Sequence, residues 1–389
     1  MKKVSNWCNA GTSHVWLRND NSVMPCCSLK TNTWNKTIFK LDERSDFRKV
    51  MASDQWKKSF GYLKFRQLPG GECEQCLSQD RFLTDDDESR SVRHKINDWA
   101  NKKMIGPRAK KGSQTPFFLK IDFSNKCNLK CVMCSSRRST GWVKDEQRLA
   151  EMGIVDPNNI KSYEKLADKW WLNNEEEWWR TVNKIEISGG EPFYEPMLFE
   201  FLEFLISIEK QNVSLTIITN LTLYNKEIDK ILNKFSNVEL LCSVDGWQED
   251  VYQYARGGIY TLATVKENIK SLSKVARKLS IVDTLHCITY DQAPLGVQWI
   301  NDQGFKNVWH NLNFVYTPRH LDARSVVPDE LLRKNELVKM PKGGIKKDKE
   351  LQIKFYNWVN ALDKVRGLNL LEIKPEFTDW FKEIESWEK

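Results

Sequence analysis

The stretch Cys127-Asn-Leu-Lys-Cys131-Val-Met-Cys134 decides how the rest of this 389-residue sequence is interpreted. Three thiolates with the spacing C-x3-C-x2-C can converge on one metal centre, and they leave one iron of a four-iron cluster without a protein ligand. Reaction chemistry needs such an open position, because a substrate or cofactor can occupy it. A structural zinc ion normally takes four protein ligands, and no fourth one lies nearby in the sequence. A zinc site completed from afar, or a chance grouping of cysteines, is the alternative.

Strand-like and helix-like segments alternate from residue 117 onward. Strands are expected over residues 117–123, 184–188, 214–219, 238–244, 282–289 and 308–316. Helices are expected between them, over residues 198–208, 226–235, 262–279 and 295–303, where apolar residues recur at helical spacing. Six such strands predict an α/β fold with a parallel sheet, either open or rolled into a partial barrel. In these folds the chemistry gathers at the carboxyl ends of the strands.

The chain is expected to divide into four parts. Residues 1–100 carry five cysteines and little regular periodicity, which indicates a small irregular domain held by a metal centre. Residues 101–116 are rich in Lys, Gly and Pro and predict a linker. The alternating segments occupy residues 117–320, and residues 321–389 predict a mostly helical C-terminal extension.

The composition excludes several classes of protein. A hydrophobic share of 40% beside 29% charged residues can build a substantial core, so wholesale disorder is excluded. The net charge of +8 is spread along the chain, which favours an ordinary solvated surface over a nucleic-acid interface. There is no apolar run of about 18 residues and no secretory signal, so we expect a soluble, cytoplasmic protein without a membrane partner. In that compartment, closely spaced cysteines indicate metal ligation rather than disulfides.

The cysteine triad resembles the signature of the radical S-adenosylmethionine (SAM) enzymes, which lies in the loop after the first strand of a partial (β/α)6 barrel. The resemblance extends over residues 117–316. It implies that Cys127, Cys131 and Cys134 hold a [4Fe–4S] cluster whose open iron chelates the amino and carboxylate groups of SAM. The reduced cluster would cleave SAM to methionine and a 5′-deoxyadenosyl radical, which abstracts a substrate hydrogen. No catalytic side chain is assigned from the sequence.

Three further motifs of this family have counterparts at the ends of later strands. Ser188-Gly-Gly-Glu-Pro192 looks like the GGE motif that binds the SAM amino group, and its glycines let the backbone approach a ligand. Thr219-Asn-Leu stands where family members often carry Thr-Asn-Gly, and Ser243-Val-Asp-Gly followed by Arg256-Gly-Gly resembles the stretch that meets the SAM ribose and carboxylate. The resemblance therefore implies SAM contacts from Gly189, Gly190, Glu191, Asn220, Ser243 and Arg256.

A second cysteine set precedes the alternating segments. Cys8 and Cys26 are followed far downstream by the knuckle Cys73-Glu-Gln-Cys76, and four thiolates complete either a zinc or a [4Fe–4S] site. The arrangement resembles the auxiliary-cluster module of the SPASM/twitch group, here placed at the N-terminus. Asn21 replaces the glycine of that module, and asparagine tolerates a positive φ better than most residues. Zinc is the alternative metal, and Cys27 is the alternative ligand to Cys26.

Tryptophan pairs stand out in a long insert between the triad and the GGE motif. Trp170-Trp171 and Trp178-Trp179 predict a helix that buries its tryptophans, with a lid or a peptide-binding surface as the alternative. Cys242 and Cys287 lie in predicted strands and are expected to be packing residues. The histidines, among them His286 and His310, show no catalytic spacing and receive no role.

The sequence thus predicts a radical SAM oxidoreductase that takes its electron from a low-potential donor such as flavodoxin or ferredoxin. An auxiliary cluster with four cysteine ligands favours net oxidation, because it could accept an electron from a substrate radical. Oxidative modification of a peptide is the leading expectation. A dehydrogenase or epimerase of a sugar, alcohol or nucleoside is the first alternative, and a non-catalytic metal-stabilised nucleic-acid-binding protein is the second.

Overall fold

A computed structural model of the chain describes residues 8, 10–26, 39–41, 46–60, 76, 118–315, 317–335, 337 and 346–387. The chain falls into two compact units. The first contains residues up to 124 together with 164–217 and 233–238, and the second contains residues 125–163, 218–232 and 239–389. Each unit is described by itself.

The first unit is built on a mixed sheet with the strand order β3-β2-β1-β4-β5-β6. Its strands are β1 (His14–Leu17), β2 (Ser22–Met24), β3 (Phe39–Lys40), β4 (Phe118–Asp122), β5 (Lys184–Ser188) and β6 (Ser214–Thr219). The N-terminal strand β1 pairs parallel with β4, so the cysteine-rich N-terminal segment adds strands to the sheet on which the expected barrel begins. The helices are α1 (Ala10–Ser13), α2 (Phe47–Ala52), α3 (Asp54–Phe60), α7 (Glu176–Thr181) and α8 (Pro196–Ser207).

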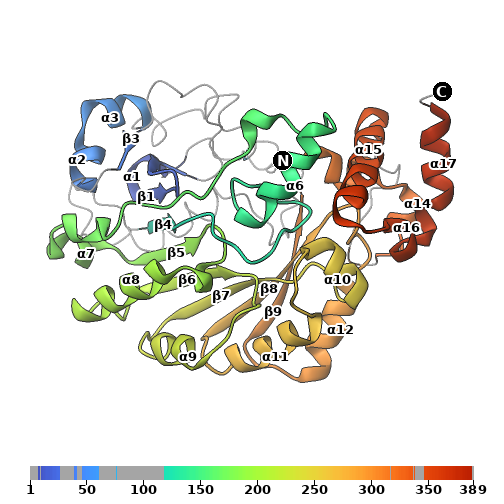
Figure 1. Cartoon of the computed structure of the whole chain (residues 1–389). Coiled ribbons are helices and arrows are strands. Elements are labelled where there is room, and N and C mark those ends of the chain that lie inside the picture. Colours follow the sequence, from blue (N-terminus) through green and yellow to red (C-terminus); the bar gives the residue numbers. More distant parts are fainter. Residues whose placement is uncertain are drawn as a thin grey trace, which may run out of the picture. The chain divides into compact units, whose positions relative to one another are not determined.

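The two faces of this sheet differ in polarity, because successive side chains of a strand point to opposite faces. One face carries the fully buried apolar residues Leu119, Ile121, Ile185 and Ile187. Helix α8 runs beside β5 and β6 (Figure 1), and its Phe201 lies 5.6 Å from the ring of Phe123, the residue after β4. The opposite face carries charged and hydroxyl side chains, with Lys120 bonded to Glu186 across β4 and β5.

The four tryptophans of the insert belong to the apolar side of the first unit. Trp170 and Trp171 lie in the 3-10 helix η5 (Trp170–Asn173), Trp178 and Trp179 lie in α7, and none of them is more than 2% exposed. The rings of Trp170, Trp171 and Trp179 all lie within 6 Å of Phe201. The expectation of packing is confirmed, and the alternative, that the insert is part of a lid or a peptide-binding surface, stays a prediction.

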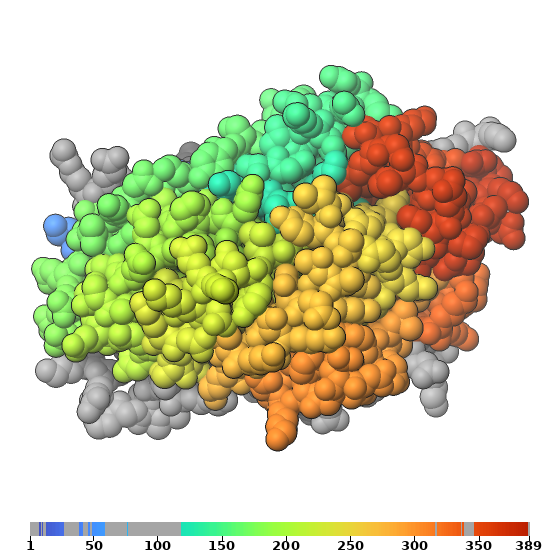
Figure 2. All heavy atoms as spheres, turned by 60° about the horizontal axis from the view of Figure 1, so that its bottom comes forward, coloured from blue at the N-terminus to red at the C-terminus, as the bar shows by residue number. Residues whose placement is uncertain are grey.

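The second unit contains the parallel strands β7 (Val238–Ser243), β8 (Lys278–Leu285) and β9 (Val308–Phe314) in that order. Its helices α6 (Val143–Glu151), α9 (Lys226–Leu232), α10 (Glu249–Arg256), α11 (Leu262–Leu272) and α12 (Ala293–Gln303) accompany these strands. Helices α10 to α12, coloured yellow to orange, form much of the surface of this unit on the face shown in Figure 2.

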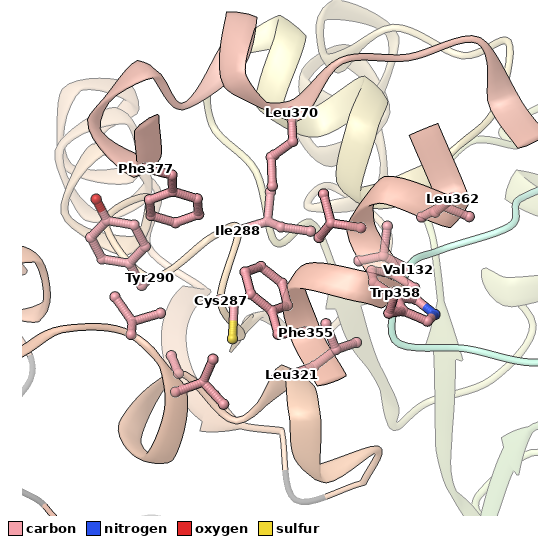
Figure 3. Packing of buried hydrophobic residues seen from close by; sticks show 14 of the residues in the cluster. Val132, Cys287, Ile288, Tyr290, Leu321, Phe355, Trp358, Leu362, Leu370 and Phe377 are labelled. Carbon is pink, nitrogen blue, oxygen red and sulfur yellow. The ribbon is translucent and has the colours of Figure 1, made fainter. Parts of the chain in front are cut away.

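The helical C-terminal extension belongs to the second unit. It consists of α13 (Ala323–Val326), α14 (Asp329–Leu332), α15 (Lys349–Arg366), α16 (Leu370–Ile373) and α17 (Thr378–Trp387). Helix α15 begins where the Asp348 side chain accepts a hydrogen bond from the Leu351 amide, and it ends at Gly367, whose φ of 66° suits glycine. Its buried residues Leu351, Phe355, Trp358 and Leu362 form one helical face that packs in the core of this unit (Figure 3).

Alternating strands and helices confirm the α/β class, and β4 to β9 are the six strands expected for a partial (β/α)6 barrel. Several boundaries differ from the prediction, most of all between residues 272 and 289. The helix expected over residues 262–279 ends at Leu272, and the strand expected over residues 282–289 spans Lys278–Leu285. Leu279 continued the apolar helical pattern, yet it pairs with Val308 of β9. The expected linker lies outside the described residues, and the domain boundaries stay predictions.

Within the described part of the chain, no helix combines the length and the apolar character that crossing a membrane requires.

Candidate functional site

The cysteine loop, residues 125–134, follows β4 and is fixed at both ends. The buried Asn125 side chain donates hydrogen bonds to the carbonyls of Ser136 (2.9 Å) and Ser162 (2.8 Å). Leu129 and Val132 are 1% exposed and anchor the middle of the loop, whereas its three cysteines are only half-buried. The loop therefore buries its apolar residues and leaves its thiols at the edge of the core.

Two glycines let the cysteine loop lie against the end of α10. The amides of Lys130 and Val132 donate to the carbonyls of Gly257 (2.9 Å) and Ala255 (2.8 Å). A Cβ atom on Gly257 would meet the Lys130 carbonyl oxygen at 2.9 Å, and one on Gly258 would meet the Leu129 side chain at 2.3 Å. The Gly-Gly pair after Arg256 thus serves close backbone packing around the triad.

Asn220, which follows β6, lies beside the first cysteine of the triad. Its Nδ2 donates to Asn128 Oδ1 at 2.9 Å and lies 3.8 Å from Cys127 Sγ. Its Oδ1 accepts from the amide (3.0 Å) and the hydroxyl (2.6 Å) of Thr222. The Asn220 side chain is engaged with the cysteine loop, so in this structure it orients Cys127.

Leu221 occupies the position where the resembled family often has glycine. Its φ is 60°, and its side chain is fully buried. A left-handed conformation costs an L-residue roughly 1–2 kcal/mol. Hydrogen bonds from the Leu221 amide to Thr219 Oγ1 (3.1 Å) and from Asn268 Nδ2 to the Leu221 carbonyl (2.7 Å) hold this conformation.

A buried ion pair lies at the end of β7. Arg256 Nη1 donates to Asp245 Oδ2 at 2.6 Å, and the two side chains are 7% and 1% exposed. The other Asp245 oxygen accepts from the Thr284 amide at 2.7 Å. Burial raises the pKa of the Asp245 carboxyl, and the Arg256 charge opposes that shift. The carboxylate therefore holds the guanidinium in one orientation.

Among the described residues, three hydrogen-bond donors in or near this ion pair lack a partner. Arg256 Nε, Tyr252 Oη and His286 Nε2 are buried and have no hydrogen-bond partner in the described part of the chain. Burial, followed by the charges of Arg256 and Lys374, lowers the pKa of His286 to about 3. Its Nδ1 accepts from the Ile288 amide (3.3 Å), so Nε2 carries the proton. Buried unpaired donors are costly, and a carboxylate ligand would satisfy them.

The triad fits an iron–sulfur cluster in its donor set and its electrostatics. Burial, followed by the charges of the neighbouring Cys131 and Cys127, raises the pKa of Cys134 to about 12. Thiolates crowded this way need a compensating positive charge, which iron ions supply. No set of three or more Cys, His, Asp or Glu side chains among the described residues is placed to hold a single metal ion. A cluster spans several atoms, so its cysteines need not converge on one point.

The GGE motif lies at the end of β5 in the first unit. Gly189 has a φ of 120°, and a Cβ atom there would meet the Ser124 carbonyl oxygen at 2.7 Å. The Gly190 amide donates to that same oxygen at 2.9 Å. Glu191 is 2% exposed, and its Oε1 accepts from the Phe193 amide at 3.1 Å. The glycines therefore serve the close approach of two strand ends, and Glu191 begins the 3-10 helix η6 (Pro192–Tyr194).

Three of the four N-terminal cysteines lie among the described residues, and Cys73 and Cys27 lie outside them. Cys8, Cys26 and Cys76 are buried, and the Ala10 amide donates to Cys8 Sγ at 3.4 Å. The positive φ expected at Asn21 is confirmed at 63°. Its side chain bonds the Lys165 carbonyl (3.2 Å) and the Ala167 amide (2.8 Å), which ties this segment to the insert.

The remaining residues singled out in the sequence fall into two groups. Ser243 ends β7 and is half-buried, as a ligand contact would require. Cys242 and Cys287 are fully buried, and burial raises the pKa of Cys287 well above its usual value, which agrees with a packing role. His310 Nε2 lies 2.8 Å from Asp283 Oδ2, a buried pair between β8 and β9 that sequence spacing did not reveal.

Sequence reasoning did not name Tyr252, and it named His286 without giving it a role. Tyr252 precedes Arg256 by one helical turn on α10, so a signal for it was available in the spacing. His286 directly follows β8, the position in which parallel folds place functional residues, and this rule could have drawn attention to it.

Several known proteins are similar to this chain. The sequence matches the radical SAM superfamily over residues 121–293. It is 28% identical over 134 residues to GTP 3′,8-cyclase of Campylobacter lari, covering 34% of this chain and 36% of that enzyme. It is 27% identical to GTP 3′,8-cyclase of Aliarcobacter butzleri over 42% of this chain and 45% of that enzyme. The matches thus span less than half the length of these curated relatives.

Similar solved structures include native anSMEcpe with bound AdoMet, at 18% identity and a TM-score of 0.39, covering 65% of this chain and 63% of that one. Streptococcus suis SuiB bound to precursor peptide SuiA is 16% identical with a TM-score of 0.38, covering 93% of this chain and 73% of that one. The α/β fold, with the triad after its first barrel strand, agrees with the match of residues 121–293 to the radical SAM superfamily.

Proposed function

We propose that this enzyme cleaves SAM reductively at a [4Fe–4S] cluster held by Cys127, Cys131 and Cys134. The observation that carries the proposal is the buried Arg256, whose Nε has no partner among the described residues and whose carbonyl accepts a hydrogen bond from Lys130, the neighbour of Cys131. A charged donor of this kind is suited to the carboxylate of SAM. The match to the radical SAM superfamily over residues 121–293 supports both the cluster and SAM.

Bound together, the cluster and SAM supply a 5′-deoxyadenosyl radical that takes a hydrogen atom from the substrate. The chain's own residues would bind SAM and orient it for this step. Asp245 holds Arg256 for the SAM carboxylate, and Tyr252 and His286 offer two further donors. Glu191, whose Oε1 accepts from the Phe193 amide, is the residue proposed for the SAM ammonium.

Four further residues complete the proposed SAM site. Asn220 keeps Cys127 in place, and Ser243 at the end of β7 would contact the ribose. Gly189 and Gly190 keep the GGE turn against the end of β4.

The proposed reaction is the oxidative modification of a peptide, with an auxiliary [4Fe–4S] cluster on Cys8, Cys26, Cys73 and Cys76 accepting the electron from the substrate radical. The resemblance of this cysteine set to the SPASM/twitch module supports the proposal, and so does the burial of the three described cysteines. Flavodoxin or ferredoxin would supply the electron for SAM cleavage. Zinc is the alternative occupant of the N-terminal site.

A purine nucleotide is the second candidate substrate. The observation that favours it is the similarity to two enzymes named GTP 3′,8-cyclase, which act on GTP by their names. A nucleotide would place phosphates in the site, and a chain with net charge +8 can attract them.

The first test measures iron, zinc and labile sulfide per chain after anaerobic reconstitution, together with 5′-deoxyadenosine released from SAM under dithionite. Two clusters predict about eight irons and eight sulfides. A result of about four irons and one zinc would make the N-terminal site structural and keep SAM cleavage. Zinc without iron, and no 5′-deoxyadenosine, would overturn the proposal.

The second test identifies the substrate class. The enzyme is incubated with GTP or with synthetic peptides encoded by short reading frames beside its gene, and substrate-dependent 5′-deoxyadenosine is measured by chromatography. We expect a peptide to raise the rate above the uncoupled background and to change in mass. Stimulation by GTP alone would replace the peptide proposal with the nucleotide.

A further inference from the structure

Arg366, the last residue of α15, reaches the cysteine loop from the C-terminal extension. Its side chain is 3% exposed. Its Nη2 donates to the Lys130 carbonyl at 2.8 Å, and its Nε donates to Asp145 Oδ2 at 2.8 Å. Its guanidinium carbon also lies 4.4 Å from the ring centroid of Trp142. A planar fork that bonds two acceptors and stacks on an indole is a geometry that lysine cannot reproduce.

The partners of Arg366 extend its effect to both peptide groups that flank Cys131. Arg366 holds the Lys130 carbonyl, which precedes Cys131. Trp142, beneath the guanidinium, donates from Nε1 to the Cys131 carbonyl at 2.8 Å. Asp145 also accepts from Lys130 Nζ at 3.0 Å. The orientation of Cys131 is therefore set by groups that belong to α6, the 3-10 helix η3 (Thr140–Trp142) and α15.

A second set of contacts joins the same helix to the other side of the loop. Asp363 accepts from Tyr254 Oη of α10 at 2.8 Å and from the Leu370 amide at 2.8 Å. Val132 of the cysteine loop belongs to the apolar core that contains Trp358 and Leu362 of α15 (Figure 3). The segment from Asp363 to Gly367 thus supports the cysteine loop, and this role is separate from the binding of SAM.

We propose that Arg366 is a positioning residue for the SAM-binding cluster, and that its buried charge raises the one-electron midpoint potential of that cluster. The inference rests on the proposed function. Arg366, Lys130 and Asp145 together carry one net positive charge. A positive charge in a low-dielectric surrounding favours the reduced cluster, which holds one more electron. Residues that orient metal ligands are commonly needed for metal affinity.

The test compares Arg366→Gln and Arg366→Lys with wild type and with Arg148→Gln as matched control. Arg148 also joins α6 to α15, through the Val365 carbonyl (3.3 Å), but it is exposed and does not touch the cysteine loop. Each reconstituted protein is titrated with dithionite while its EPR spectrum is recorded. The cluster in question is the one whose signal changes when SAM is added. Loss of iron to a chelator gives a second readout that is independent of activity.

For Arg366→Gln we expect iron loss to be about 10–100-fold faster than in wild type, as for other residues that orient metal ligands. We also expect a more negative midpoint potential, because a positive charge is removed. Arg366→Lys keeps the charge, so its potential should stay near wild type while its iron loss is still accelerated. Arg148→Gln should match wild type in both readouts.

A wild-type midpoint and a wild-type rate of iron loss in Arg366→Gln would overturn the inference and leave the proposed function intact. Absence of iron or SAM cleavage in wild type would instead overturn the proposed function. If Arg366→Gln does not fold, Trp142→Phe decides, because it keeps an aromatic ring beneath Arg366 and removes the donor to Cys131. Faster iron loss in Trp142→Phe supports the inference, and an unchanged rate overturns it.

Discussion

The two cysteine sets of this chain are organised in opposite ways. The triad places three thiols within one short loop, and residues far along the chain hold that loop, among them Asn220 and Arg366. The N-terminal set spreads its cysteines over separate segments, from Cys8 to Cys76. A site whose ligands come from separate segments gains its order from the metal, because metal-binding free energy becomes folding free energy. We therefore expect the triad to be preorganised and the N-terminal set to be metal-dependent.

The largest expected effect comes from Cys131→Ala. It removes one of three thiolates from the proposed SAM-binding cluster, so 5′-deoxyadenosine formation should fall below detection. Because the N-terminal set is separate, about four irons should remain per chain. Retained SAM cleavage in this variant would disprove the assignment of the triad, and loss of all iron would show that the two sets are not independent.

Cys76→Ala tests the N-terminal cysteine set. It should leave dithionite-driven SAM cleavage in place while iron falls by about four per chain, as expected for loss of one cluster. Modification of the substrate should stop, because the proposed electron acceptor is missing. Limited proteolysis should cut the N-terminal segment faster than in wild type. Unchanged proteolysis with halved iron would contradict the metal-dependent order of this region.

Arg256→Gln tests the region around the triad, which we expect to be preorganised. Hydrogen bonds to charged groups contribute about 1.5–3 kcal/mol, so SAM affinity should weaken by roughly 10–150-fold. Leaving Asp245 buried without its partner should also lower the free energy of unfolding by about 3–5 kcal/mol. Equilibrium dialysis with SAM and chemical denaturation measure the two effects separately. Arg256→Lys, which keeps a charge, should lose less stability, and wild-type SAM affinity in Arg256→Gln would remove Arg256 from the site.

The smallest expected effect concerns Asn21. Asn21→Gly and Asn21→Ala both lose the bonds to Lys165 and Ala167, but only alanine must adopt a φ of 63° against its preference. Alanine should therefore be roughly 1–2 kcal/mol less stable than glycine at this position. Urea denaturation of the reconstituted protein measures the difference. Equal stabilities would show that the turn relaxes and that the segment is less ordered than the triad region.

Short sequence patterns predicted some of the strands correctly. Residues 184–188 and 214–219 form strands with the predicted bounds, because their apolar residues fit buried parallel strands and turn residues flank them. The end of α11 was predicted too late because Val275 and Leu279 continue the helical spacing of its apolar residues, although Leu279 and Ile281 have the spacing of a strand. Asn21 was recognised because its backbone preference is intrinsic to its side chain.

Long-range contacts account for what the sequence could not predict. The partners of Arg366 are Lys130 and Asp145, far from it along the chain, and no periodic signal connects them. His310 and Asp283 meet only because β8 and β9 are adjacent. The buried donors of Tyr252 and His286 depend on the packing around them. Motifs thus predicted the residues proposed to bind the cluster and SAM. Only the structure shows which other residues keep those residues in position.

The contact between Arg366 and the cysteine loop has a consequence for how the protein is made. The ribosome synthesises residues 125–134 long before it reaches α15 (Lys349–Arg366), so the nascent loop lacks the groups that orient Cys131. Until that helix emerges and docks, the three thiols are exposed to oxidation and to stray metal ions. We therefore expect correct loading of the proposed cluster to follow translation of α15.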